Sequence, residues 1–137
     1  MNAPRTETVK GRDQRRARRS PVRFPATYRL VREDGEGATR SIDSEALDLS
    51  LLGVMLQTDL IEVEGLSLLP AMDPDPLTRI DMHLELGATH PTVSATGRVV
   101  WVRRSSTGTR RKYTAGVVFS YLSVDSQQVL RSYLETQ

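Results

Sequence analysis

Residues 22–31 read VRFPATYRLV, a stretch in which apolar and polar side chains alternate. Every second residue from Val22 onward is apolar, and the residues between them are mostly polar. A period of two is typical of a β-strand with one buried face. Pro25 has no N–H group to donate to a neighbouring strand, which favours a position at a sheet edge. The stretch therefore predicts a half-buried strand, and Pro25 predicts that this strand is an edge.

Similar strand patterns follow along the chain. Asp34-Gly35 favours positive φ and separates the first strand from a second one running to about Leu49, so the two are expected to form a hairpin. Further strands are predicted at residues 54–57, 80–86, 93–102 and 113–119. In the longest of these we expect Gly97 to produce a bend or bulge. Trp101 shares a face with Ala95 and Val99, so we expect it to pack in the core.

The segment 59–78 shows neither a strand period nor a helix period. Gly65, Pro70 and the run DPDPL at 73–77 interrupt it, and they predict an irregular loop with a short turn of helix near 66–69.

The period changes at the C-terminus. Asp125 is expected to cap a helix, with Gln128 three residues later, and Val124 and Val129 stand at the positions of a hydrophobic staple. The apolar stripe of this predicted helix comprises Val129, Leu130, Tyr133 and Leu134.

Six closely spaced strands without a βαβ rhythm predict an antiparallel barrel or sandwich, with the helix covering one end. The fold class is therefore all-β with a terminal helix. A chain of 137 residues is long enough for one compact domain. We expect residues 1–20, which have no apolar period, to form a flexible basic N-terminal arm, and residues 21–137 to form the folded domain.

The charge of the chain is unevenly distributed. Residues 1–32 contain ten Arg or Lys against two acidic residues, a net charge of +8, whereas residues 33–137 contain nine basic and fifteen acidic residues, a net charge of −6. Most of the basic residues are Arg, whose planar guanidinium suits phosphate groups and guanine edges. An anionic partner that meets the N-terminal end is expected.

Several classes of protein fit the sequence poorly. The absence of cysteine excludes disulfides, thiolate metal sites and a cysteine nucleophile. His83 and His90 have no acidic partner at metal-ligand spacing, and His83 falls on the polar side of its strand, where we expect it to face solvent. No apolar run is long enough for a membrane span or a secretory signal, so a cytoplasmic protein is expected.

Two polar clusters carry a family resemblance. Arg15 and Arg19 lie in RRARR at 15–19, and Asp48, Ser50 and Gly53 lie in DLSLLG at 48–53. Arg-x-x-x-Arg, then a strand, then Asp-x-Ser-x-x-Gly about thirty residues later resembles the PilZ family of cyclic di-GMP receptors. GRVVWV at 97–102, AGVVFSYL at 115–122 and the terminal helix also resemble that family, whereas 59–78 matches less clearly.

The resemblance implies a six-stranded antiparallel PilZ-like β-barrel closed by a short C-terminal α-helix, with cyclic di-GMP as ligand and with neither metal nor another cofactor. Arg15 and Arg19 would contact guanine or phosphate, since a guanidinium can bond or stack on both. Asp48 would accept from a guanine edge and Ser50 would add a polar bond. Gly53 would let the backbone approach the ligand or supply positive φ.

Simpler interpretations stand beside these. Arg15 and Arg19 could be a solvated tail, and Asp48 with Ser50 could be an Asx or ST turn that only satisfies the backbone. Whether Arg16 assists Arg15 is left open. Trp101 is more simply a core residue than a platform for guanine.

The expected function is a receptor whose N-terminal arm becomes ordered on ligand binding and relays the signal to an unidentified protein partner. One alternative is a ligand-independent protein adaptor of the same fold. Another is a nonspecific nucleic-acid binder acting through the basic arm, which no reading helix supports. No membrane partner is expected. An enzyme is the least favoured class, because no Ser-His-Asp arrangement, Walker loop or metal cluster is visible.

Overall fold

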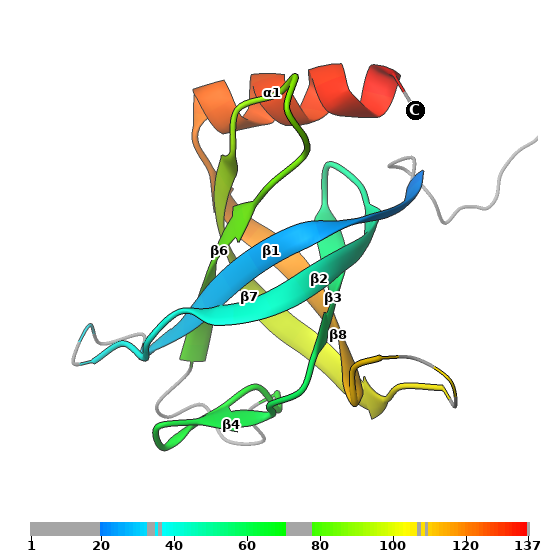
Figure 1. Ribbon diagram of the computed structural model, residues 1–137. Helices are drawn as coiled ribbons and strands as arrows, with labels where there is room; N and C mark the ends of the chain where they lie inside the picture. Colours follow the sequence, from blue (N-terminus) through cyan, green and yellow to red (C-terminus); the bar gives the residue numbers. More distant parts are fainter. Residues whose placement is uncertain are drawn as a thin grey trace, which may run out of the picture.

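The computed structural model describes residues 20–32, 35, 37–70, 78–106, 108 and 110–136. Within these residues six strands form a closed antiparallel barrel in the order β1-β2-β3-β8-β7-β6, and β6 pairs with β1 (Figure 1). The barrel strands are β1 (Ser20–Arg32), β2 (Ile42–Leu49), β3 (Gly53–Thr58), β6 (Thr78–Leu84), β7 (Val93–Arg104) and β8 (Tyr113–Leu122). The predicted six-stranded barrel with a C-terminal helix is confirmed.

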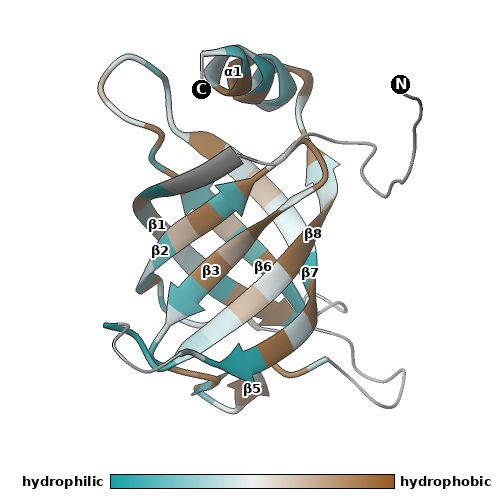
Figure 2. Ribbon diagram, turned by 90° about the vertical axis from the view of Figure 1, so that its right-hand side faces the viewer, coloured by the Kyte–Doolittle hydropathy of each residue, from teal (hydrophilic) through white to brown (hydrophobic). Residues whose placement is uncertain are grey.

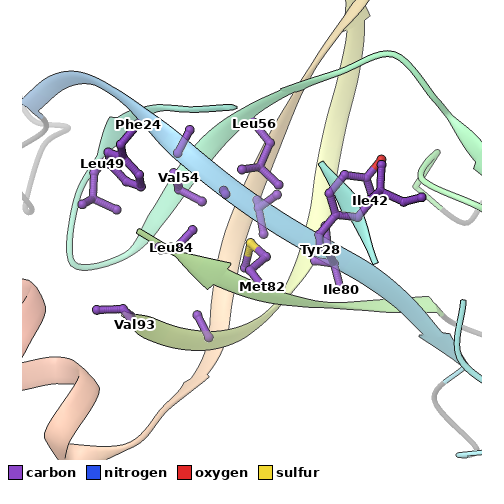
Figure 3. Packing of buried hydrophobic residues seen from close by; sticks show 14 of the residues in the cluster. Phe24, Tyr28, Ile42, Leu49, Val54, Leu56, Ile80, Met82, Leu84 and Val93 are labelled. Atoms are coloured by element: carbon purple, nitrogen blue, oxygen red, sulfur yellow. The ribbon is translucent and has the colours of Figure 1, made fainter. Parts of the chain in front are cut away.

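Apolar side chains that alternate along the strands fill the barrel interior. In β1, Phe24, Tyr28 and Leu30 are buried, whereas Arg23 and Arg29, at the alternate positions, are exposed. Figure 3 shows buried side chains of the other strands meeting them inside the barrel: Ile42, Leu49, Val54, Leu56, Ile80, Met82, Leu84 and Val93. Each large apolar side chain buried in this way contributes about 1.5–3 kcal/mol to folding.

The edge position predicted from Pro25 is wrong, because β1 is bonded to β2 on one side and to β6 on the other. Proline is nevertheless tolerated at this point. The β1–β6 register ends at the pair Ala26–Leu84, and the carbonyl of Pro25 accepts from the N–H of Glu85 just beyond it. The missing N–H of Pro25 therefore falls outside the β1–β6 ladder.

The helix turn predicted near residues 66–69 is also wrong. The chain instead forms a small antiparallel sheet of β4 (Glu62–Val63) and β5 (Leu66–Ser67). Glu64 and Gly65, which join the two strands, both have positive φ, 51° and 88°. Two consecutive residues with positive φ are typical of the type I′ turn of a tight hairpin. The predicted irregular run at 73–77 lies outside the described residues.

The helix α1 (Val124–Glu135) lies across one end of the barrel (Figure 1, Figure 2). Its predicted apolar stripe is confirmed, since Leu130 and Tyr133 are buried and Val129 and Leu134 pack against the core. The rings of Tyr133 and Phe24 meet edge to face, with centroids 6.1 Å apart. The described part of the chain has no helix that is long and apolar enough to span a membrane.

The start of this helix differs from the prediction. Ser123, and not Asp125, is the N-cap, and its side chain accepts from the N–H of Ser126 at 3.1 Å. Asp125 lies in the first turn, where a carboxylate interacts favourably with the helix dipole. The predicted staple of Val124 and Val129 is not formed, because Val124 is 68% exposed.

β7 contains two irregularities in its pairing with β8. The first lies between Thr96 and Gly97, where an irregularity was predicted, but the extra residue is Ser120 of β8, so the bulged strand is β8 and not β7. The second lies between Val99 and Trp101 and reverses the alternation, so that Val102 takes the inward position. The predicted core position of Trp101 is therefore wrong, and its ring covers Gly116 on the outside of the barrel, where an added Cβ would lie 2.2 Å from Trp101 Nε1.

Candidate functional site

The motif Asp-x-Ser-x-x-Gly forms the connection from β2 to β3. The backbone N–H of Ser50 donates to the carbonyl of Gly53 at 3.0 Å, which closes the turn. The Ser50 hydroxyl accepts from the N–H groups of Leu52 and Gly53, at 3.0 and 3.3 Å. Phe119 of β8 donates its N–H to the carbonyl of Leu52 at 2.8 Å, which ties the turn to the barrel. The turn is thus a rigid structure whose hydrogen bonds are satisfied from within and from β8.

Ser50 has the structural role that the simpler interpretation assigned to it. Its side chain is 6% exposed and holds an ST turn. A hydroxyl that accepts two N–H groups still has its own hydrogen to donate. The structural role of Ser50 is therefore compatible with an additional contact to a ligand.

Asp48 has an unusual backbone conformation, with φ of 46° at the end of β2. Few residues other than glycine adopt this left-handed conformation, and aspartate tolerates it better than most. The β1–β2 register is irregular at the same level: Ser20 pairs with Leu49 and Arg23 with Leu47, so β1 carries one extra residue opposite Asp48. The side chain of Asp48 is partly exposed. Strained backbone of this kind occurs often at binding sites.

Gly53 is required for the contact between two strands. Its φ lies outside the left-handed region, so the prediction that it supplies positive φ is wrong. A Cβ at this position would lie 2.2 Å from the carbonyl oxygen of Val117 in β8. The close approach of β3 to β8 thus explains why the third motif position is glycine.

Arg15, Arg19 and Arg16 lie outside the described residues. The structure does describe Ser20, which directly follows Arg19 in the sequence and pairs with Leu49 of β2. The chain therefore enters the barrel beside the turn that begins after Leu49. Residues that are far apart in the sequence, Ser20 on one side and Asp48 with Ser50 on the other, come together at one end of the barrel.

A shallow cavity lies next to this turn and was not predicted. It has a volume of about 200 Å³ and is lined by Leu51 of the turn, by Tyr121 of β8 and by Arg131 of α1, among others. Tyr121 is 65% exposed. Arg131 follows the motif by more than seventy residues and lies on the polar side of a helix, so no local signal in the sequence connects it with the turn.

The two histidines have no role in this site. His83 is exposed, as predicted, and its Nδ1 lies 3.2 Å from the hydroxyl oxygen of Ser94. His90 packs edge to face on Tyr133, with ring centroids 5.4 Å apart. In the part of the chain that the structure describes, no three His, Asp or Glu side chains are grouped closely enough to hold a metal ion.

A family model described as the PilZ domain matches residues 13–136, nearly the whole chain. The chain belongs to the PilZ domain family. PilZ domains are in general receptors for cyclic di-GMP, and they are binding or adaptor modules and not enzymes. No curated protein gives a significant sequence match.

Two solved structures support the PilZ fold. The Bacillus subtilis inhibitor of motility (MotI/DgrA) aligns with 93% of this chain at 14% identity, with a TM-score of 0.61. The chain spans about half of that protein, 53% of its length. The PilZ domain of YcgR from Escherichia coli, solved with c-di-GMP, aligns with 90% of this chain and 91% of its own at 15% identity, with a TM-score of 0.58. At these identities the likeness concerns the fold.

Proposed function

We propose that this PilZ domain is a receptor for cyclic di-GMP without catalytic activity of its own. In this proposal Arg15 and Arg19 of the N-terminal arm hold the ligand against the β2–β3 turn, where Asp48 and Ser50 contact it. Residues 15–19 become ordered on binding, and the arm with its ligand forms a new surface that a protein partner recognises.

One observation carries the proposal, the pairing of Ser20 with Leu49. Arg19 is covalently joined to Ser20, and consecutive Cα atoms are about 3.8 Å apart. The long side chain of Arg19 can therefore reach a ligand that lies on Asp48 or Ser50. Arg15 lies only four residues earlier in the sequence, so we assign it to the same ligand.

The chemistry of these residues suits a cyclic dinucleotide of guanine. Its phosphates and the O6 and N7 atoms of guanine accept from a guanidinium, and the base face can stack on one. The N1–H and N2 groups of guanine donate, and the carboxylate of Asp48 can accept from both. The solved complex of the YcgR PilZ domain with c-di-GMP supports the choice of ligand by family likeness.

The first test is isothermal titration of cyclic di-GMP into the native protein and into R15A/R19A, at low and at high salt, with GTP as a control ligand. Charge-assisted hydrogen bonds contribute about 1.5–3 kcal/mol each, so the double variant should lose at least about a hundredfold in affinity. The control variant R5A/R12A removes the same two charges from the arm outside the motif. It should bind within about threefold of the native protein.

A second variant examines the turn. D48N keeps a side chain that tolerates positive φ but removes the carboxylate. It should therefore lower the affinity for cyclic di-GMP by about tenfold or more without unfolding the barrel. If native protein does not bind cyclic di-GMP, the ligand-independent adaptor is favoured. If R15A/R19A and R5A/R12A lose affinity equally and both losses grow at low salt, the arm is a nonspecific polyanion contact.

A further inference from the structure

The hairpin that joins β7 to β8 carries an unusual concentration of positive charge. Of the nine basic residues between positions 33 and 137, five lie within ten consecutive positions. They are Arg103, Arg104, Arg110, Arg111 and Lys112. The other residues of this range include four basic and fifteen acidic ones, so the hairpin is a positive tip on an otherwise negative barrel.

Two of these cations are held against aromatic rings. The guanidinium carbon of Arg103 lies 5.0 Å from the centroid of the Trp101 ring, and that of Arg104 lies 5.9 Å from the centroid of the Tyr113 ring. Both distances are within the range of cation–π contacts. Because Arg103 and Arg104 are consecutive in a strand, they project from opposite faces of the hairpin. The tip is therefore positive on both faces. Because aromatic rings already hold Arg103 and Arg104, less side-chain entropy is lost when the tip binds.

The remaining cations divide into two kinds. Arg111 is mostly buried and forms an ion pair with Asp59 at 3.4 Å, so it serves the fold. Arg103, Arg104, Arg110 and Lys112 are exposed, and among the described residues none of them has a carboxylate within ion-pair distance. Together with Trp101 these four residues are called the hairpin surface below.

The outward position of Trp101 depends on the irregular pairing after Val99. Without that bulge the indole would point into the barrel, as the alternation of the sequence predicts. Val100, the extra residue of this bulge, is 50% exposed. Bulges commonly redirect a side chain next to a functional surface. Trp, Tyr and Arg are the residue types most enriched among the residues that dominate binding energy at protein interfaces.

The hairpin surface lies away from the candidate ligand site. Gly53 of the β2–β3 turn pairs with Val118, and the opposite end of the same ladder is the pair Thr58–Tyr113, beside the hairpin. Five residues of β8 separate the two positions, roughly 17 Å. Figure 1 shows α1 at one end of the barrel and the connection from β7 to β8 at the other. Cyclic di-GMP on Asp48 and Ser50 would not cover the hairpin.

We propose that the hairpin surface binds an acidic groove on a protein partner, which accepts the positive tip between its walls. The charges around the tip favour an acidic partner that contacts the tip alone over a broad anionic surface that reaches past it. Asp59 lies at the base of the hairpin, where it also accepts from the N–H of Lys112 at 3.1 Å, and Glu62 and Glu64 are exposed in the adjacent small sheet. Arg111 and Arg40 pair with Asp59 and Glu64, but no ion pair is seen for the exposed Glu62 among the described residues, so a nucleic-acid duplex or a lipid surface that extends past the tip would meet this carboxylate and be repelled.

The proposal is tested by NMR on the isotope-labelled whole chain, titrated separately with a poly-glutamate peptide, a mixed-sequence DNA duplex and phosphatidylglycerol vesicles. Amide signals of the hairpin and the indole N–H signal of Trp101 report on the hairpin surface, and signals of residues 1–19 report on the basic arm. We expect poly-glutamate to shift the hairpin signals and the indole signal saturably. The variant R110E/K112E should weaken this response about tenfold.

The control R5E/K10E changes the same two residue types to Glu in the arm and should leave the response of the hairpin within about twofold. Shifts confined to the arm, or a stronger hairpin response to duplex or vesicles than to poly-glutamate, would overturn the proposal. Cyclic di-GMP titration into R110E/K112E should match the native protein. A failure of the receptor function would thus be distinguishable from a failure of the docking surface.

Discussion

Asp48 and Glu64 have nearly the same left-handed backbone, with φ of 46° and 51°, but they have it for different reasons. Among the described residues they are the only non-glycine residues with positive φ. Glu64 is exposed and is followed by Gly65 in a two-residue hairpin turn, whose geometry demands positive φ. Asp48 stands in no such turn. It precedes Leu49, which is fully buried, and lies opposite the extra residue of β1.

The comparison separates backbone strain that a local turn explains from strain that the surrounding structure imposes. The turn at Glu64 depends on residues next to one another in the sequence. The conformation of Asp48 depends on β1, on the buried Leu49 and on a turn tied to β8. Strain held by the wider fold can position a carboxylate for a ligand, which is the role we propose for Asp48.

The largest expected effect comes from the glycines of the two turns. G53A would place a Cβ 2.2 Å from the carbonyl oxygen of Val117, so we expect a loss of about 3 kcal/mol in the free energy of unfolding. G65A meets no atom within 4 Å and suffers only from its φ of 88°, at a cost of about 1 kcal/mol. Urea denaturation of both variants measures the difference. Equal losses would show that close packing against β8 is not what Gly53 provides.

A smaller effect is expected from the serines that brace the two turns. S50A removes the acceptor of the Leu52 and Gly53 N–H groups from a buried position and should cost about 2 kcal/mol. Ser67 accepts one exposed N–H, that of Leu69, and S67A should cost less than about 0.5 kcal/mol. Thermal unfolding of the two variants gives the comparison. A loss in S50A as small as that in S67A would mean that the β2–β3 turn holds its shape without the hydroxyl.

Local patterns in the sequence predicted the inner faces of most strands and the stripe of α1, because alternation and helical period survive wherever pairing is regular. They failed where one residue changes the period. The bulge after Val99 turned Trp101 outward, and a bulge of this kind depends on how β7 pairs with β8 and not on the residues of β7 alone. The prediction of the N-cap of α1 was wrong for a related reason. Ser123 and Asp125 are both good caps, and the end of β8 at Leu122 decides between them.

The residues of the candidate turn could be predicted from the sequence, but the contacts that explain some of them could not. Asp48, Ser50 and Gly53 are close together in the sequence, so their turn could be recognised from spacing. That Gly53 accommodates Val117, and that Arg131 lines a cavity beside the turn, depends on contacts between distant segments. The pairing of Ser20 with Leu49, which brings the basic arm to the turn, depends on the register of β1 and β2.

The hydroxyl of Tyr28 helps to attach the segment containing Glu64 to the barrel. The buried hydroxyl of Tyr28 lies 2.8 Å from that of Thr58 and donates to the carbonyl of Leu60 at 3.4 Å, just before β4. Y28F should therefore cost about 1 kcal/mol. Burial raises the pKa of Tyr28 above its ordinary value of 10.0. The unfolded chain thus ionises first, and the stability that this group provides is complete below pH 10.0 and is lost as the pH rises through the folded-state pKa.

Denaturation at several pH values around and above 10.0 tests this sign, with native protein and Y28F compared. The native protein should lose stability more steeply with rising pH than Y28F does. Tyr133, whose pKa burial also raises, is present in both proteins and contributes equally. Identical pH profiles would show that the Tyr28 hydroxyl is not held in its neutral form by the fold.

The smallest expected effect is the difference in stability between substitutions at Glu64 and at Asp48, the two residues with left-handed backbone. E64N should stabilise the protein by about 0.5 kcal/mol, because Asn-Gly is the preferred pair for a type I′ turn. The variant also loses the ion pair of Glu64 with Arg40 at 3.0 Å. Both side chains are largely exposed, so the pair contributes only about 0.3 kcal/mol. D48N makes the corresponding change at the other turn, where no type I′ geometry rewards it, so we expect no gain in stability and a loss in cyclic di-GMP affinity. Scanning calorimetry on both variants measures the change in stability, and titration calorimetry on D48N measures the loss in cyclic di-GMP affinity. A gain in stability for D48N equal to that for E64N would remove the distinction between the turns, since strain at Asp48 would then be as local as strain at Glu64.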